Sequence, residues 1–243
     1  MFVNRCIQRM PDDLPLTPPL QCTHCQQPFP LRAHFPLLGY FLSDGHCSHC
    51  QHPISLQPLI VDLLVIGSTL AVGLWRPLPQ GVIDLLFIYT LILITMIDWN
   101  TLSIEPRVIV IIISVRLSWL ILFERDFFVR AIIGLLVGAG AFYFIGFFYE
   151  TLRRRQGLGD GDAAVLGLIG LWVGWASLHW VVLIAALSGI LIGVTRLIAQ
   201  KQSIADTPIP FAPFLCLGGG IVYFLQNLIS AENIRITDWF FVH

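Results

Sequence analysis

Two aspartates stand where long apolar segments of this chain meet polar sequence. Asp98 ends the run LLFIYTLILITMI, and Asp162 directly precedes the run AAVLGLIGLWVGW. A carboxylate beside bilayer hydrocarbon is energetically costly, so a carboxylate at such a place is a candidate functional group. Two of them at the same kind of boundary predict a pair that works as acid and base, which is the chemistry that activates water. The competing interpretation is structural: Asp98 as the polar end of one helix, and Asp162 as the N-cap of the next.

Glycines surround the second aspartate in the run Gly157-Leu158-Gly159-Asp160-Gly161-Asp162. Without a Cβ, a glycine lets the backbone turn tightly and lets a partner helix or an extended substrate come close. A GxGD run alone is a weak signal. With a second boundary aspartate on the same predicted side of the membrane, it favours a site over a pair of helix caps.

Four cysteines form two CxxC pairs with 21 residues between the pairs. These are Cys22, Cys25, Cys47 and Cys50. Two CxxC turns at this separation present four thiolates to a tetrahedral zinc ion, and an all-cysteine set predicts a closed, structural site. Disulfides or inert thiols are the alternatives, and a reducing cytoplasm disfavours disulfides. The remaining cysteines, Cys6 and Cys216, have no partner in the sequence and are interpreted as structural.

The composition indicates a polytopic membrane protein, because 56% of the 243 residues are hydrophobic and only 12% are charged. The net charge of -1 argues against binding of nucleic acid. The predicted domains are a segment at 1–11, a cysteine-containing module at 12–58, a membrane-embedded domain at 59–229 and a tail at 230–243. Membrane helices are expected near 59–75, 81–97, 107–123, 131–149, 163–177, 179–199 and 211–229. The fold class is therefore all-α and polytopic, with a small zinc-ribbon-like module.

The basic residues predict the orientation. If the cysteine module lies in the cytoplasm, about twice as many basic residues lie on the cytoplasmic side as on the outer side, as the positive-inside rule requires. The same orientation places Asp98 and Asp162 together at the cytoplasmic face. This agreement is independent, because the orientation rests on basic residues alone.

Five ordered segments of the chain resemble the type IV prepilin peptidases, a family of membrane aspartyl proteases of the GxGD kind. The segments are FVNRCIQRMP, the CxxC…CxxC module with HFPLLGYF, GHC and HPIS, then MIDWNTLSIEP, GLGDGD and IPFAPFLCLG. The likeness covers nearly the whole chain.

The resemblance implies a bifunctional enzyme of the bacterial inner membrane. Such an enzyme cleaves the basic leader from type IV prepilins or type II secretion pseudopilins at the cytoplasmic face. It then methylates the new N-terminus with S-adenosylmethionine. By position, the resemblance makes Asp98 and Asp162 the catalytic pair and assigns zinc to Cys22, Cys25, Cys47 and Cys50. Its expected partners are these pilin substrates and membrane lipid.

The chain departs from the family pattern at several positions. Ile104-Glu105-Pro106 stands where the family usually has LPD, Ala164 replaces a lysine, and Asp62 replaces a glutamate. Met1 falls inside the segment that follows the family's first membrane helix. We therefore expect a cytoplasmic N-terminus, and a methyltransferase activity weaker than the peptidase activity. The alternatives are a non-catalytic pilus or secretion assembly factor derived from this family and, further off, a proton or ion carrier that uses the two aspartates as a relay.

Overall fold

The computed structural model describes residues 2–11, 22, 24, 25, 27, 45–153, 159–200 and 210–231. Across these ranges the protein is helical, and the one strand-like pairing is an isolated bridge between His46 and Pro53. The helices are α1 (Phe2–Arg9), α3 (Gln57–Trp75), α4 (Leu78–Thr101), α5 (Pro106–Phe123), α6 (Arg125–Arg153), α7 (Asp160–Val173), the short 3₁₀ helix η2 (Trp175–Ser177), α8 (Leu178–Gln200) and α9 (Ala212–Ala231). The predicted all-α fold is confirmed.

Six of these helices are long and apolar enough to cross a bilayer: α3, α4, α5, α6, α8 and α9. The seventh expected span, at 163–177, forms a helix, but α7 has only 14 residues. It ends because Gly174 adopts a φ of 76°, a left-handed conformation that breaks the helix before η2. Most of 12–44, the motif residues Gly157 and Leu158, and the tail beyond 231 lie outside the described residues.

Local sequence explains where several helices begin and end. Pro106 opens α5 after Glu105, whose backbone is extended. A proline suits the first turn, where its missing N–H has no partner in any case. Helix α4 ends at Thr101, because the next residue, Leu102, has a φ of 53°; the Leu102 N–H bonds to the carbonyl oxygen of Asp98 at 2.9 Å. Asp98 therefore lies in the last turn of α4.

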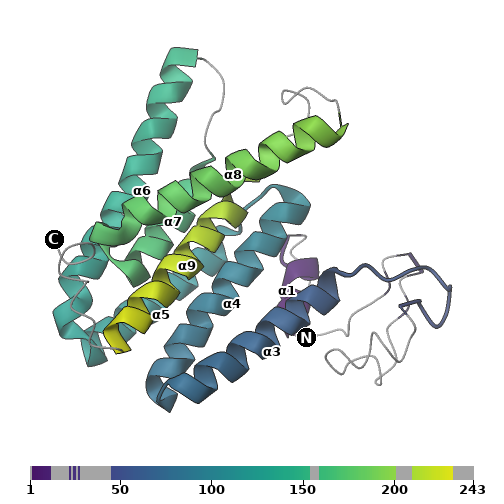
Figure 1. Ribbon diagram of the computed structural model, residues 1–243, viewed down its shortest axis with the longest axis horizontal. Helices are drawn as coiled ribbons and strands as arrows, with labels where there is room; N and C mark the ends of the chain where they lie inside the picture. Colours follow the sequence, from purple (N-terminus) through teal and green to yellow (C-terminus); the bar gives the residue numbers. More distant parts are fainter. Residues whose placement is uncertain are drawn as a thin grey trace. The chain divides into compact units, whose positions relative to one another are not determined.

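The chain divides into two compact units, Met1–Leu93 and Ile94–His243. In the first unit, α1 lies beside α3 (Figure 1). The Nδ2 atom of Asn4 donates to Oδ1 of Asp62 at 2.9 Å and to the Pro58 carbonyl at 3.2 Å. Near the other end of α3, Arg76 pairs with the buried Asp84 at 3.0 Å. Polar contacts thus fix α1 to α3 and α3 to the start of α4.

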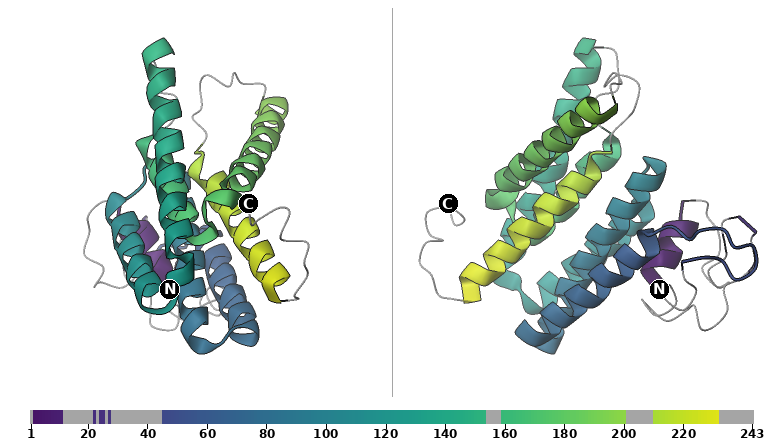
Figure 2. Two further views of the ribbon diagram at one scale, coloured as in Figure 1. Left: turned by 90° about the vertical axis from the view of Figure 1, so that its left-hand side faces the viewer. Right: turned by 45° about the vertical axis from the view of Figure 1, so that its right-hand side comes forward.

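In the second unit, α7 is the central helix and contacts α5, α6, α8 and α9 (Figures 1 and 2). Every residue from Val165 to Gly174 is buried. A helix that is apolar on all sides must be surrounded on all sides, which is the position α7 occupies.

Glycines bring the backbones of α6 and α7 into direct contact. A Cβ on Gly134 would collide with the backbone of Gly170, and a Cβ on Gly170 would collide with that of Gly134. One turn further along α6, a Cβ on Gly138 would lie 2.6 Å from the Leu166 carbonyl oxygen. These contacts set the position of α7, and therefore of Asp162 in its first turn.

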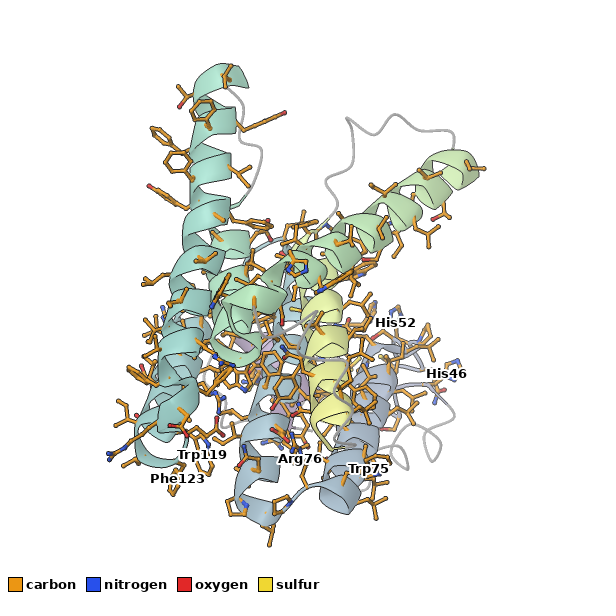
Figure 3. The ribbon with its side chains drawn as sticks, turned by 60° about the vertical axis from the view of Figure 1, so that its left-hand side comes forward. His46, His52, Trp75, Arg76, Trp119 and Phe123 are labelled. Atoms are coloured by element: carbon orange, nitrogen blue, oxygen red, sulfur yellow. The ribbon has the colours of Figure 1, made fainter. Side chains whose placement is uncertain are left out.

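A buried arginine of α5 contacts the connection between α5 and α6 and a ring of α7. Arg116 of α5 donates to Oε2 of Glu124 at 2.9 Å, and Trp119 Nε1 donates to Oε1 of the same carboxylate at 2.9 Å. The guanidinium also lies 5.2 Å from the centre of the Trp172 ring of α7. Figure 3 marks Trp119 beside Phe123 at this end of α5, where their rings are 4.3 Å apart. Arg116 thus ties α5 to the start of α6 and to α7.

Candidate active site and metal centre

The four cysteines predicted to bind metal come together in the first unit. The Sγ atoms of Cys22 and Cys50 are 3.8 Å apart, as are those of Cys25 and Cys47, and all four lie within 4.8 Å of one another. Four sulfurs bound tetrahedrally at about 2.3 Å from one zinc ion would lie roughly 3.8 Å apart. The cluster therefore has the dimensions of a Cys₄ metal site and could hold a metal ion.

Backbone turns hold the first cysteine of each pair. The Cys22 N–H bonds to the Gln27 carbonyl at 3.0 Å, and the Cys47 N–H bonds to the His52 carbonyl at 2.9 Å. The N–H groups of Cys50 and His49 point at the Cys47 sulfur and lower its pKa to about 6. They favour the thiolate, which is the form that binds metal.

The pKa of Cys22 is lowered in the same way, by the N–H groups of Cys25 and His24. In the part of the chain that the structure describes, the His24 and His52 rings stack 4.7 Å apart, and the cluster that could hold a metal contains cysteines alone. Figure 3 marks His46 and His52 in the segment that carries Cys47.

The two candidate catalytic residues both lie in the second unit. Asp98, in the last turn of α4, is 5% exposed, and its carboxylate accepts the N–H of Ala212 at the start of α9. Its Oδ2 atom is buried and has no hydrogen-bond partner among the described residues. A buried carboxylate oxygen without a partner is costly, and such an atom calls for an explanation.

Asp162 lies in the first turn of α7, outside the six helices long enough to span the bilayer. Its own N–H bonds to the Gly159 carbonyl at 3.0 Å, and its carboxylate accepts the Gly159 N–H. Burial and, to a smaller extent, the charge of Asp98 raise its pKa to about 6, although the Gly159 N–H lowers it. The protonated form of Asp162 is therefore accessible near neutral pH, as a pair that shares one proton requires.

Two residues beside the aspartates were not identified from the sequence. Cys216 of α9 is buried, hydrogen-bonds with Thr95 of α4, and lies within electrostatic range of both carboxylates. Thr95 is one turn before Asp98, and Cys216 is one turn after Ala212. Contacts at two successive levels therefore fix α4 against α9. Cys216 was interpreted only as structural, and its place in IPFAPFLCLG was the signal that could have located it.

Sequence comparisons identify the family of the chain. The profile described as "Bacterial Peptidase A24 N-terminal domain" matches residues 1–76, and that of the "Type IV leader peptidase family" matches 85–194. A relative from Legionella pneumophila is 30% identical over 225 residues, 90% of this chain and 75% of the relative. The chain belongs to the type IV leader peptidase family.

Two further relatives support this assignment. One from Pectobacterium carotovorum subsp. carotovorum is 29% identical over 208 residues, 83% of this chain and 72% of the relative. One from Aeromonas hydrophila is 28% identical over 210 residues, 86% of this chain and 72% of the relative. All three relatives bear the name prepilin leader peptidase/N-methyltransferase. No solved structure matches the chain.

Proposed function

We propose that this protein is a membrane aspartyl endopeptidase that removes the basic leader from type IV prepilins or type II secretion pseudopilins. The observation that carries the proposal is the buried Oδ2 atom of Asp98, which has no hydrogen-bond partner in the described part of the protein and belongs to a carboxylate coupled to Asp162. In a peptidase this atom has a use, because it can accept a proton from the attacking water. The family assignment supports the same reaction.

The pair works as acid and base in this proposal. One aspartate is ionised and takes a proton from water as the water oxygen attacks the carbonyl carbon of the scissile bond. The other is protonated and donates a hydrogen bond to the carbonyl oxygen. The C–N bond then breaks, and the departing amine takes up the proton that the first aspartate received from water, which returns the pair to its starting state. A Cβ on Gly159 would lie 3.6 Å from Oδ2 of Asp162, so its absence leaves space beside this carboxylate for an extended substrate segment.

The four cysteines hold a structural zinc ion in this proposal, and zinc takes no part in the cleavage. Zinc bound by four thiolates has no open position for water and stabilises the fold. Methylation of the new N-terminus by S-adenosylmethionine is proposed on the name of the relatives alone, and no residue is assigned to it.

The proposed location is the bacterial inner membrane, with Asp98, Asp162 and the cysteine module on the cytoplasmic side. The excess of basic residues on that side supports this orientation. The proposed domains are those expected from the sequence: 1–11, the zinc module 12–58, the membrane-embedded peptidase 59–229 and the tail 230–243.

The test is to co-express the chain with a prepilin and to follow leader removal by the change in mobility on a gel. We expect cleavage by the wild type and none by Asp98→Asn or Asp162→Asn, with membrane insertion unchanged in both. Asp160→Asn is the matched control and should retain cleavage, since the motif assigns catalysis to Asp162. Normal cleavage by either of the first two variants would refute the mechanism. An inactive wild type that still supports pilus assembly would favour the assembly factor.

A further inference from the structure

The loop that follows Asp98 packs directly against the backbone that precedes Asp162. Ile104 lies in the short connection between α4 and α5, and Gly161 lies in the first turn of α7. A Cβ placed on Gly161 would lie 2.7 Å from Cδ1 of Ile104, 3.0 Å from its Cβ and 3.1 Å from its Cγ1. The isoleucine therefore occupies the space that any other residue at position 161 would need.

This contact is rigid. The Cβ of Ile104 is among the atoms in the way, so a change of rotamer cannot clear them all. A β-branched side chain also has few χ1 rotamers to choose from. Ile104 thus acts as a spacer of fixed size between the end of α4 and the start of α7.

The contact lies where it can set the separation of the two carboxylates. Each carboxylate has its own backbone donor, Ala212 for Asp98 and Gly159 for Asp162. Those donors orient each side chain separately. The contact between Ile104 and Gly161 links the end of the element carrying Asp98 to the residue before Asp162.

We propose that Ile104 is a positioning residue for the reaction, and that it sets the spacing of Asp98 and Asp162 through its contact with the Cβ-less face of Gly161. The proposal rests on the peptidase function proposed above. Acid–base catalysis needs donor and acceptor within about 2.6–3.2 Å of the reacting atoms, and a displacement of about 1 Å can lower the rate on the order of a hundredfold. A side chain of a different size at position 104 should therefore lower kcat more than it changes KM.

The test is a size exchange at the two positions, with kcat and KM for prepilin cleavage measured on purified protein. Gly161→Ala should lower kcat by roughly a hundredfold, because the new methyl group pushes Ile104 away. The double variant Gly161→Ala/Ile104→Ala should recover at least about tenfold of that loss, since the truncation removes the contacts with Cδ1 at 2.7 Å and Cγ1 at 3.1 Å and leaves only the Cβ at 3.0 Å. Ile104→Ala alone should lower kcat about tenfold and leave KM within about twofold, and Ile104→Leu should restore most of the activity. Leu102→Ala, in the same loop and half-exposed, is the matched control and should match the wild type.

The outcomes separate the two proposals. An active wild type with no recovery in the double variant, or with unchanged kcat in Ile104→Ala, overturns the positioning role and leaves the peptidase function standing. A rise in KM equal to the loss in kcat/KM also overturns it, because that pattern indicates a role in binding. A wild type that cleaves no prepilin refutes the peptidase function and the positioning role with it.

Discussion

Replacement of Gly138 by alanine should move α7 and thereby disturb Asp162. The added Cβ would lie 2.6 Å from the Leu166 carbonyl oxygen and 2.9 Å from the carbonyl carbon. The obstacle is backbone, so no side chain can rotate away. Leu166 is one turn after Asp162 in α7, and a push at Leu166 is therefore transmitted to the first turn.

The size of the displacement follows from ordinary contact distances. A carbon atom rests about 3.3 Å or more from a carbonyl oxygen, so the two helices must separate by roughly 0.7 Å. Alanine is a better helix former than glycine by about 1 kcal/mol, whereas overpacking of this kind costs about 1–3 kcal/mol. The net loss of stability is therefore small, about 0–2 kcal/mol, and the protein should still fold. A shift of this size at a catalytic carboxylate should lower cleavage on the order of tenfold or more.

Gly140→Ala is the matched control in the same helix. A Cβ on Gly140 would meet nothing within 4 Å, so the same substitution carries the gain in helix propensity without the collision. Both variants would be purified in detergent, and prepilin cleavage and thermal unfolding would be measured side by side. We expect lower cleavage for Gly138→Ala and wild-type cleavage for Gly140→Ala. Equal activity of the two variants would show that the close contact between α6 and α7 does not position Asp162.

Three further predictions concern other parts of the protein. Because the pKa of Asp162 is raised in the folded protein, folding favours its protonated form. The free energy of unfolding of the wild type therefore falls as the pH rises from about 3.8 to about 6. Asp162→Asn, although inactive, should therefore gain thermal stability over the wild type across that window and keep the gain at higher pH; a constant difference at all pH values would contradict this. Elemental analysis should find one zinc ion per chain, and Cys47→Ser should lower this content, whereas a metal-free wild type with an intact fold would leave the cluster unexplained. Arg116→Met should destabilise the second unit by about 3–5 kcal/mol because it leaves the Glu124 carboxylate without its cation. Arg116→Met/Glu124→Gln should unfold at a higher temperature than Arg116→Met, and an equal melting temperature would argue against the ion pair.

Much of the candidate chemistry could be predicted from the sequence because it depends on residue type and short spacing. A CxxC turn brings two thiols together locally, so two turns already imply a four-sulfur site, and the structure places those sulfurs at distances suited to a metal. Long apolar runs bounded by prolines and polar residues predict helices, and seven helices occupy the expected stretches. Asp98 and Asp162 are candidates from the sequence alone, because a carboxylate beside bilayer hydrocarbon is energetically costly.

The tertiary structure decided which residues surround those aspartates. The residue types of Thr95, Ile104 and Cys216 do not show what these side chains contact, and the structure places all three at the contacts around Asp98 and Asp162. The physical reason lies in the helices themselves. A helix that is apolar on every side has no amphipathic stripe, so its sequence does not say which face packs against which neighbour. That choice is made by close backbone contact at particular glycines, such as Gly134 against Gly170, and it exists only once the helices have met.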